Sequence, residues 1–360
     1  MIYYLIASIL IAVAALFART KRAVLAAGIL FYAVQIAAAG LLLWGGLYDT
    51  TSAAFFTFDA LGTLFYLLLV VVSMYVFGHS EAYLQGEDLR SYRLYFALLM
   101  LLTTAIAGAY FANNLAVTWI FLEATTLCSA GIIYHRRTAQ ALEAAWKYVF
   151  VCSTGIAMAY LGILLLAAAT KCETLSYEAV AEAASSGNPL YLKTSFLLIL
   201  SGYSCKLELF PLYTVGIDAN FAAPAPASAL ISTGVVNAGF LALLRVYKLL
   251  AGTEVFPWVR SVLLIVGILS LGVGALSCAA PTTTNASSPT PPSRTWASPP
   301  SGWASAASAY GRRCSTYSAI RSSKAVSSCR WPSYGRCTTA TASTASATTS
   351  ASTASGPSAC

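Results

Sequence analysis

Two ionisable residues lie inside apolar stretches that are long enough to cross a bilayer. Glu123 lies within Leu115–Tyr134, and Lys206 lies within Leu192–Tyr213. An ionised side chain in hydrocarbon costs several kcal/mol, so such residues usually face a protein interior or a wet cavity and mark an ion or proton path. Desolvation favours neutral lysine and a nearby carboxylate favours the ammonium, so a buried Lys206 beside Glu123 can load and release a proton. In contact, the two would titrate as a coupled pair.

Simpler interpretations exist for both residues. Glu123 can be a protonated carboxyl that hydrogen-bonds one helix to another, and Lys206 can be held in a permanent salt bridge.

Glu143 and Lys147 are four residues apart and share a helix face at the membrane edge, where they can relay protons inward. An equal alternative is an ion pair at the helix start, with Lys147 extended to the interface.

Proline is predicted to interrupt the stretch that carries Lys206. Pro211 removes a backbone hydrogen bond and should break the helix about one turn after Lys206. Broken helices line substrate paths in transporters, so this break is a candidate mobile element. The supporting residues around it are Pro224, Asn237 and Asp218. The last two, like Asp59, can equally be helix-end or packing residues.

The composition places these residues in a polytopic membrane protein. Hydrophobic residues make up 58% of the chain and charged residues 9%, with a mean hydropathy of +0.71. Each span needs about 20 mainly apolar residues. We predict an all-α bundle of nine transmembrane helices, at Ile2–Phe17, Ala23–Gly46, Phe58–Phe77, Tyr92–Phe111, Leu115–Tyr134, Ala144–Thr170, Leu192–Tyr213, Ala227–Leu249 and Pro257–Cys278.

Loop charges predict the orientation. Several basic residues fall on one side of this arrangement, which the positive-inside rule makes cytoplasmic; they are Arg19, Lys21, Arg22, Arg90, Arg93, Arg136 and Arg137. Lys248 and Arg260 fall on the other side. Basic residues follow the first apolar run, so we interpret that run as a retained span and not as a signal peptide. The N-terminus is predicted to lie outside an inner (plasma) membrane.

The last 80 residues differ in composition from the rest of the chain. Residues 281–360 contain no Leu, Phe, Asp or Glu, and they carry seven basic residues of a net charge of +8. Such a segment cannot bury enough apolar area to offset its chain entropy, so it is predicted to be disordered. The basic charge is a property of this tail and does not indicate nucleic acid as a partner. We predict three parts: residues 1–112, a proton-translocating repeat at 113–280, and the tail at 281–360.

Cysteine and histidine usage indicates no metal or cofactor. Five cysteines lie scattered before residue 280 with no C-x-x-C pair. His79 and His135 flank spans, so a pair of haem ligands within the membrane is excluded. Any electron transfer must take place in another subunit, and the chain is predicted to have no catalytic centre of its own.

Several motifs resemble one membrane-protein family. They are LEATTL around Glu123, LEAAWKY around Lys147, K-x-x-x-F-P from Lys206, and D-A-x-x-x-A-P-x-P-x-S-A-L-x-S from Asp218, followed by Arg245. The chain is similar to the antiporter-like membrane subunits of respiratory complex I and membrane-bound hydrogenases, hydrogenase-4 component F most of all. The resemblance implies that Glu123 and Lys206 are the family's span-five glutamate and span-seven lysine, and that Lys147 is the basic residue that opens span six. It implies proton pumping driven by a redox reaction in partner subunits.

The chain also departs from the family pattern. Tyr213 stands where the family usually has a histidine, and Val215-Gly216-Ile217-Asp218 replaces W-L-P-D. Glu208 stands where a small residue is usual. Asn237 replaces the lysine of some relatives, although component F is similar here.

The tail is predicted to be a frameshift product. Permissible codons for Pro281–Ala297, read in one shifted frame, can encode NNYKRILAYSSVENMG. The same frame over Tyr317–Ala325 can encode FSHSLVKS, and both strings are similar to later segments of the family. The chain would then lack the second inverted repeat of such transporters and keep one half-channel. It is not expected to pump by itself.

Three functions remain open from the sequence. The leading prediction is a redox-driven proton-translocating subunit of a hydrogenase-4-type or complex I-like assembly. Its partners would be other membrane subunits, the lipid bilayer, and protons, with sodium as the alternative ion. The second is a subunit of a multisubunit cation/proton antiporter that needs no electron donor. The third is a non-transporting scaffold whose buried charges only hold helices together.

Overall fold

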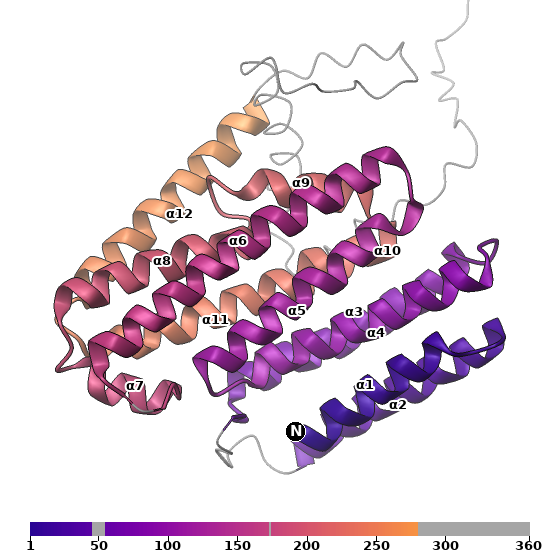
Figure 1. Cartoon of the computed structure of the whole chain (residues 1–360), viewed down its shortest axis with the longest axis horizontal. Coiled ribbons are helices and arrows are strands. Elements are labelled where there is room, and N and C mark those ends of the chain that lie inside the picture. The colour runs from indigo at the N-terminus through magenta and orange to yellow at the C-terminus, as the bar shows by residue number, and fades with distance from the viewer. Residues whose placement is uncertain (45–54, 173, 280–360) are drawn as a thin grey trace, which may run out of the picture. The chain divides into compact units, whose positions relative to one another are not determined.

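The computed structural model describes residues 1–44, 55–172 and 174–279 (Figure 1). These residues form helices and no extended strands, as predicted. The helices are α1 (Ile2–Leu16), α2 (Lys21–Trp44), α3 (Ala60–Tyr83), α4 (Leu89–Phe111), α5 (Leu115–Ile133), η1 (Tyr134–Arg136), α6 (Ala139–Thr170), α7 (Tyr177–Ala184), α8 (Pro189–Leu207), α9 (Tyr213–Ala222), α10 (Ala225–Leu230), η2 (Ile231–Val235), α11 (Val236–Leu249), η3 (Leu250–Gly252) and α12 (Phe256–Ala279). The predicted tail at 281–360 lies outside the described residues.

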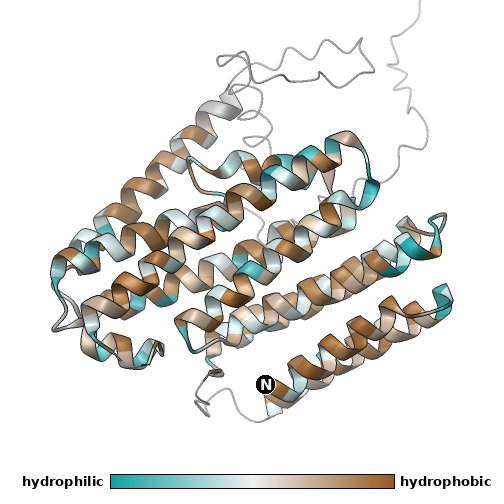
Figure 2. Cartoon of the chain, in the orientation of Figure 1, coloured by the Kyte–Doolittle hydropathy of each residue, from teal (hydrophilic) through white to brown (hydrophobic). Residues whose placement is uncertain are grey.

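Seven helical segments of the described chain are long and apolar enough to cross a membrane, against the nine that the sequence predicted. The difference has two causes. α1 is apolar but only 15 residues long. α8 covers most of the predicted span Leu192–Tyr213 and is 19 residues long, but its polar residues, with Lys193 and Lys206 among them, leave it less apolar than the helices that qualify. Figure 2 shows hydrophobic residues along the helices and hydrophilic ones mainly near their ends, as a multi-span membrane protein requires.

Short polar side chains set the starts of the helices. Asp59, Asn114, Thr138 and Asn188 each accept a hydrogen bond from a backbone N–H in the first turn of α3, α5, α6 and α8, respectively. These caps satisfy donors that the helix itself cannot pair. Asp59 is therefore the helix-end residue that the sequence allowed for.

Small residues bring α6 and α8 close together. A Cβ on Gly202 of α8 would lie 2.3 Å from the carbonyl oxygen of Gly155 and 2.7 Å from the backbone nitrogen of Ala159, both on α6. Only glycine permits this approach, which is typical of helix pairs packed in membranes. The contact places the residues of α6 directly against the last turns of α8.

The Lys206 helix is broken, as predicted, but it ends earlier than one turn beyond that residue. α8 stops at Leu207, and Glu208 caps it with a left-handed backbone at φ 54°. Pro211 explains the position: its ring clashes with the carbonyl four residues earlier, which is that of Leu207, and it offers no N–H to that group. The peptide bond before Pro211 is cis. The break, residues 208–212, is bounded by the end of α8 and the start of α9 at Tyr213. Pro224 caps α10 further along the chain.

Candidate functional site

Lys206 is buried at the end of α8. The residue is only 2% exposed. Its Nζ donates a hydrogen bond of 3.3 Å to the hydroxyl of Tyr148 on α6. The ammonium also lies 5.1 Å from the centroid of the Tyr148 ring, within the range of a cation–π contact. In the part of the chain that the structure describes, no carboxylate lies within 4 Å of it. Lys206 is therefore held by neutral groups.

Glu123 lies in the middle of α5 and is half-buried. Its Oε1 accepts a hydrogen bond of 2.6 Å from the hydroxyl of Ser153 on α6. Its Oε2 is buried and has no hydrogen-bond partner among the described residues. A buried carboxyl oxygen needs a polar partner, so this atom is suited to meeting internal water or to carrying a proton.

Glu123 and Lys206 do not form a direct ion pair: within the described ranges, none joins them at 4 Å or less. Both contact α6 instead, through Ser153 and Tyr148. These two residues are five positions apart, which corresponds to about 7.5 Å along the helix and about 140° around it. The arrangement links the two charges through α6, and not through the direct contact that the sequence had suggested.

The predicted Glu143–Lys147 pair is present at the start of α6. Lys147 Nζ lies 2.5 Å from the Glu143 carboxylate and 3.9 Å from that of Asp218 on α9. Both carboxylate side chains are more than half exposed, so each pair contributes little stability. The contact with Asp218 joins α6 to the helix after the break. No sequence pattern indicates this contact, because Asp218 is 71 positions further along the chain than Lys147.

Asn237 is half-buried on α11 and lies close in sequence to the point where α11 meets Lys206. Gly239 marks that point, because a Cβ placed on it would lie 3.0 Å from the Cβ of Lys206. α11 follows a π-helical segment, η2, whose Gly234 carbonyl accepts a hydrogen bond from the Tyr110 hydroxyl at 3.1 Å. A π segment frees backbone groups for such bonds and often marks functional helices.

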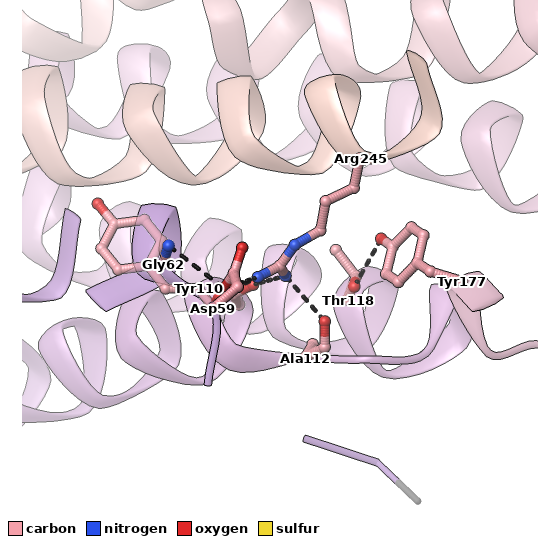
Figure 3. A network of polar contacts seen from close by, with 8 residues as sticks. Asp59, Gly62, Tyr110, Ala112, Thr118, Tyr177 and Arg245 are labelled. Carbon is pink, nitrogen blue, oxygen red and sulfur yellow. Dashed lines mark hydrogen bonds and ion pairs between the residues drawn. The ribbon is translucent and has the colours of Figure 1, made fainter. Parts of the chain in front are cut away.

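A second cation, Arg245 on α11, is largely enclosed, with 10% of its side chain exposed, and lies in a very different setting (Figure 3). Its guanidinium donates to the Asp59 carboxylate at 2.9 Å and to the carbonyls of Tyr110 and Ala112 at 2.5 and 2.8 Å. Those carbonyls lie at the C-terminal end of α4, where a helix presents unpaired acceptors and the negative end of its dipole. Arg245 therefore fastens α11 to the start of α3 and the end of α4.

Tyr177, the first residue of α7, completes this cluster. Its hydroxyl lies 3.0 Å from that of Thr118 on α5, and its ring lies 5.8 Å from the Arg245 guanidinium carbon. Burial raises the pKa of Tyr177, and the nearby Arg245 only partly opposes this effect. The phenol therefore stays protonated at neutral pH. No sequence pattern pointed to Tyr148, Ser153 or Tyr177, because helix periodicity indicates a face but not the partner that packs on it.

Comparisons with known proteins find similar membrane subunits. Residues 112–285 match the family described as NADH:quinone oxidoreductase/Mrp antiporter, transmembrane. The chain is 30% identical over 210 residues to a hydrogenase-4 component F homolog of Methylacidiphilum infernorum, covering 55% of this chain and 44% of that protein. It is 34% identical over 183 residues to NADH-quinone oxidoreductase subunit N of Deinococcus radiodurans, covering 49% and 36%. The chain thus spans less than half the length of these two relatives.

The fold has a solved counterpart. A chain of the membrane-bound sulfane sulfur reductase, an archaeal respiratory membrane complex, superposes with a TM-score of 0.68 at 22% identity, covering 86% of this chain and 61% of that one. This likeness shows the fold alone. The matched segment, residues 112–285, contains the residues around Glu123, Lys147, Lys206 and Arg245 described above. Residues 112–285 are thus similar to the antiporter-like family of membrane subunits described for NADH:quinone oxidoreductases and Mrp antiporters.

Proposed function

We propose that the protein is a proton-translocating membrane subunit of a redox-driven assembly of the hydrogenase-4 or complex I type. The observation that supports this most is the setting of Lys206, which is buried inside the protein against a neutral hydroxyl. A lysine can give up its proton when its surroundings do not hold the charge, whereas a lysine locked by a carboxylate cannot readily do so. The similarity of residues 112–285 to the NADH:quinone oxidoreductase/Mrp antiporter family also supports a role as a proton-translocating subunit.

The proton path in this proposal runs along α6. The cluster of Lys147, Glu143 and Asp218 forms the entry at the helix start. Lys206 receives the proton and passes it by way of the Tyr148 hydroxyl, which can accept one proton and release another. Glu123 binds it next, with internal water bridging from Tyr148 to the carboxyl. Water-mediated hydrogen bonds serve such gaps well.

The break after α8 is the mobile element. Residues 208–212, with Pro211 among them, separate Lys206 from α9, and α9 carries the Asp218 that meets Lys147. A shift of α9 would therefore change the entry cluster and the surroundings of Lys206 together. Pro224 and Asn237 support this region from α10 and α11.

The setting that we propose is a bacterial or archaeal inner membrane with the N-terminus outside. Other membrane subunits of the assembly supply the redox reaction in this proposal. The ion is the proton, with sodium as the alternative. The family also contains Mrp antiporters, so a subunit of a multisubunit cation/proton antiporter is the second candidate function.

Inverted membrane vesicles from the producing cells test the proposal. Proton uptake on addition of an electron donor is compared for wild type, Glu123→Gln and Lys206→Ala, and assembly is checked by native gel. We expect both variants to lose uptake by about 100-fold, as when a positioned acid–base group is removed. Uptake that persists while the complex assembles would favour a scaffold. Uptake driven by a cation gradient without any electron donor would favour the antiporter.

A further inference from the structure

Glu208 is a buried carboxyl that the path above does not use. The residue is 8% exposed and caps α8 two positions after Lys206. Its backbone lies in the left-handed region at φ 54°, which residues other than glycine adopt less often. Such a conformation is common where helices end, and Arg137 and Lys171 also adopt it at helix ends. The burial of the side chain is therefore the unusual feature of this glutamate.

Hydrogen bonds tie this carboxyl to the next two helices. Its Oε1 accepts a bond of 3.1 Å from the side-chain amide of Asn220 on α9, and the Asn220 carbonyl oxygen accepts one of 3.0 Å from the hydroxyl of Ser228 on α10. Gly216 on α9 makes room, because a Cβ there would lie 2.5 Å from Oε1. The carboxyl, the amide and the hydroxyl thus form one chain across the break.

The same carboxyl lies close to Lys206 along the chain. Lys206 is in the last turn of α8, and Glu208 is the residue that caps this helix. α9, which holds Glu208 through Asn220, also carries the Asp218 that meets Lys147.

We propose that Glu208 is a third proton-binding group of the transport path and that Asn220 and Ser228 convey its protonation to α10. This inference rests on the proposed function. A carboxylate can only accept hydrogen bonds, so the amide nitrogen of Asn220 faces it. When a proton from Lys206 binds Glu208, the new hydroxyl donates, the Asn220 amide turns over, and Ser228 then accepts a bond that it formerly donated. No atom other than that proton moves between groups.

The experiment uses the vesicle assay above together with infrared spectroscopy of the purified chain in lipid. Glu208→Gln keeps the shape and the bond to Asn220 but cannot ionise, and Asn220→Leu keeps the volume but removes the relay. We expect uptake to fall by about 100-fold in the first variant and by less in the second. The infrared band of a protonated carboxyl that titrates in wild type should disappear in Glu208→Gln.

Two further variants make the result decisive. Glu182→Gln removes an exposed carboxyl on α7 and should change neither uptake nor that band. Ser228→Ala should leave the band in place while slowing uptake. If Glu208→Gln retains both the band and full uptake while Glu123→Gln and Lys206→Ala abolish uptake, the role of Glu208 is disproved and the proposed function stands. If none of them affects uptake, the proposed function itself fails.

Discussion

Arg245 and Lys206 are both cations enclosed by the helices, but their surroundings differ in kind. Arg245 has an aspartate and several backbone carbonyls around a rigid fork that stays protonated at any physiological pH. Lys206 has the hydroxyl and ring of one tyrosine. The first arrangement fixes a charge in place. The second sets no carboxylate within ion-pair distance of the ammonium, which is what the proposed proton transfer requires. Burial of a charge is therefore not enough to indicate transport; the identity of its partners decides.

The comparison is tested most strongly by removing each charge in turn. Arg245→Met would leave the Asp59 carboxylate and the α4 carbonyls without their donor. We expect the free energy of unfolding to fall by about 3 kcal/mol, the lower end for a broken buried pair, because Asp59 is 34% exposed. Lys206→Met strands no anion, so its loss should be much smaller. Chemical denaturation in detergent measures the free energy of unfolding of both variants. Equal losses would contradict the proposed difference between the surroundings of Arg245 and Lys206.

The contact of α6 with α8 holds Tyr148 against Lys206, and it can be loosened. Gly202→Ala would place a methyl group 2.3 Å from a carbonyl oxygen of α6, so the helices must separate. We expect a cost of about 2 kcal/mol from overpacking, together with slower proton uptake. Gly40→Ala on α2 is the matched control, since nothing lies within 4 Å of its added methyl group. Normal uptake in Gly202→Ala would show that the close approach is not needed.

Removing one hydroxyl sharpens the comparison further. Tyr148→Phe keeps the ring beneath the ammonium but deletes the acceptor at 3.3 Å. The expected loss of unfolding free energy is about 1 kcal/mol, a typical value for one hydrogen bond. Proton uptake should fall far more than stability does. If uptake and stability fell only in proportion, the hydroxyl would be a structural support and not a relay.

The smallest effect is expected at the Arg245 cluster. Tyr177→Phe removes only the bond to Thr118, at a cost of about 0.5 kcal/mol. Burial raises the pKa of Tyr177 above its usual value near 10, so the phenol stays protonated at lower pH. The loss of unfolding free energy in Tyr177→Phe should therefore be constant from about pH 6 to 9. Thermal unfolding across this range checks it. A cost that varied with pH would show that the tyrosine ionises in the folded protein.

Sequence reasoning predicted the helical membrane fold, the break after Lys206 and the Glu143–Lys147 pair, because each depends on local composition or spacing. It did not predict what lies between Glu123 and Lys206, since the face that α6 turns to each neighbour depends on helix packing. The end of α8 at Leu207 could have been read from Pro211, whose clash falls four residues earlier. The contact of Asp218 with Lys147 could not have been read from the sequence, because it forms only after the chain has folded back.

The central claim is that Lys206 must release a proton, and Lys206→Arg tests it most directly. Arginine keeps the charge and can still contact Tyr148 but does not deprotonate in proteins. In inverted vesicles containing an assembled complex, we expect proton uptake to fall by about 100-fold, and Lys206→Met should give the same loss. Uptake at the wild-type rate in both variants would contradict the account.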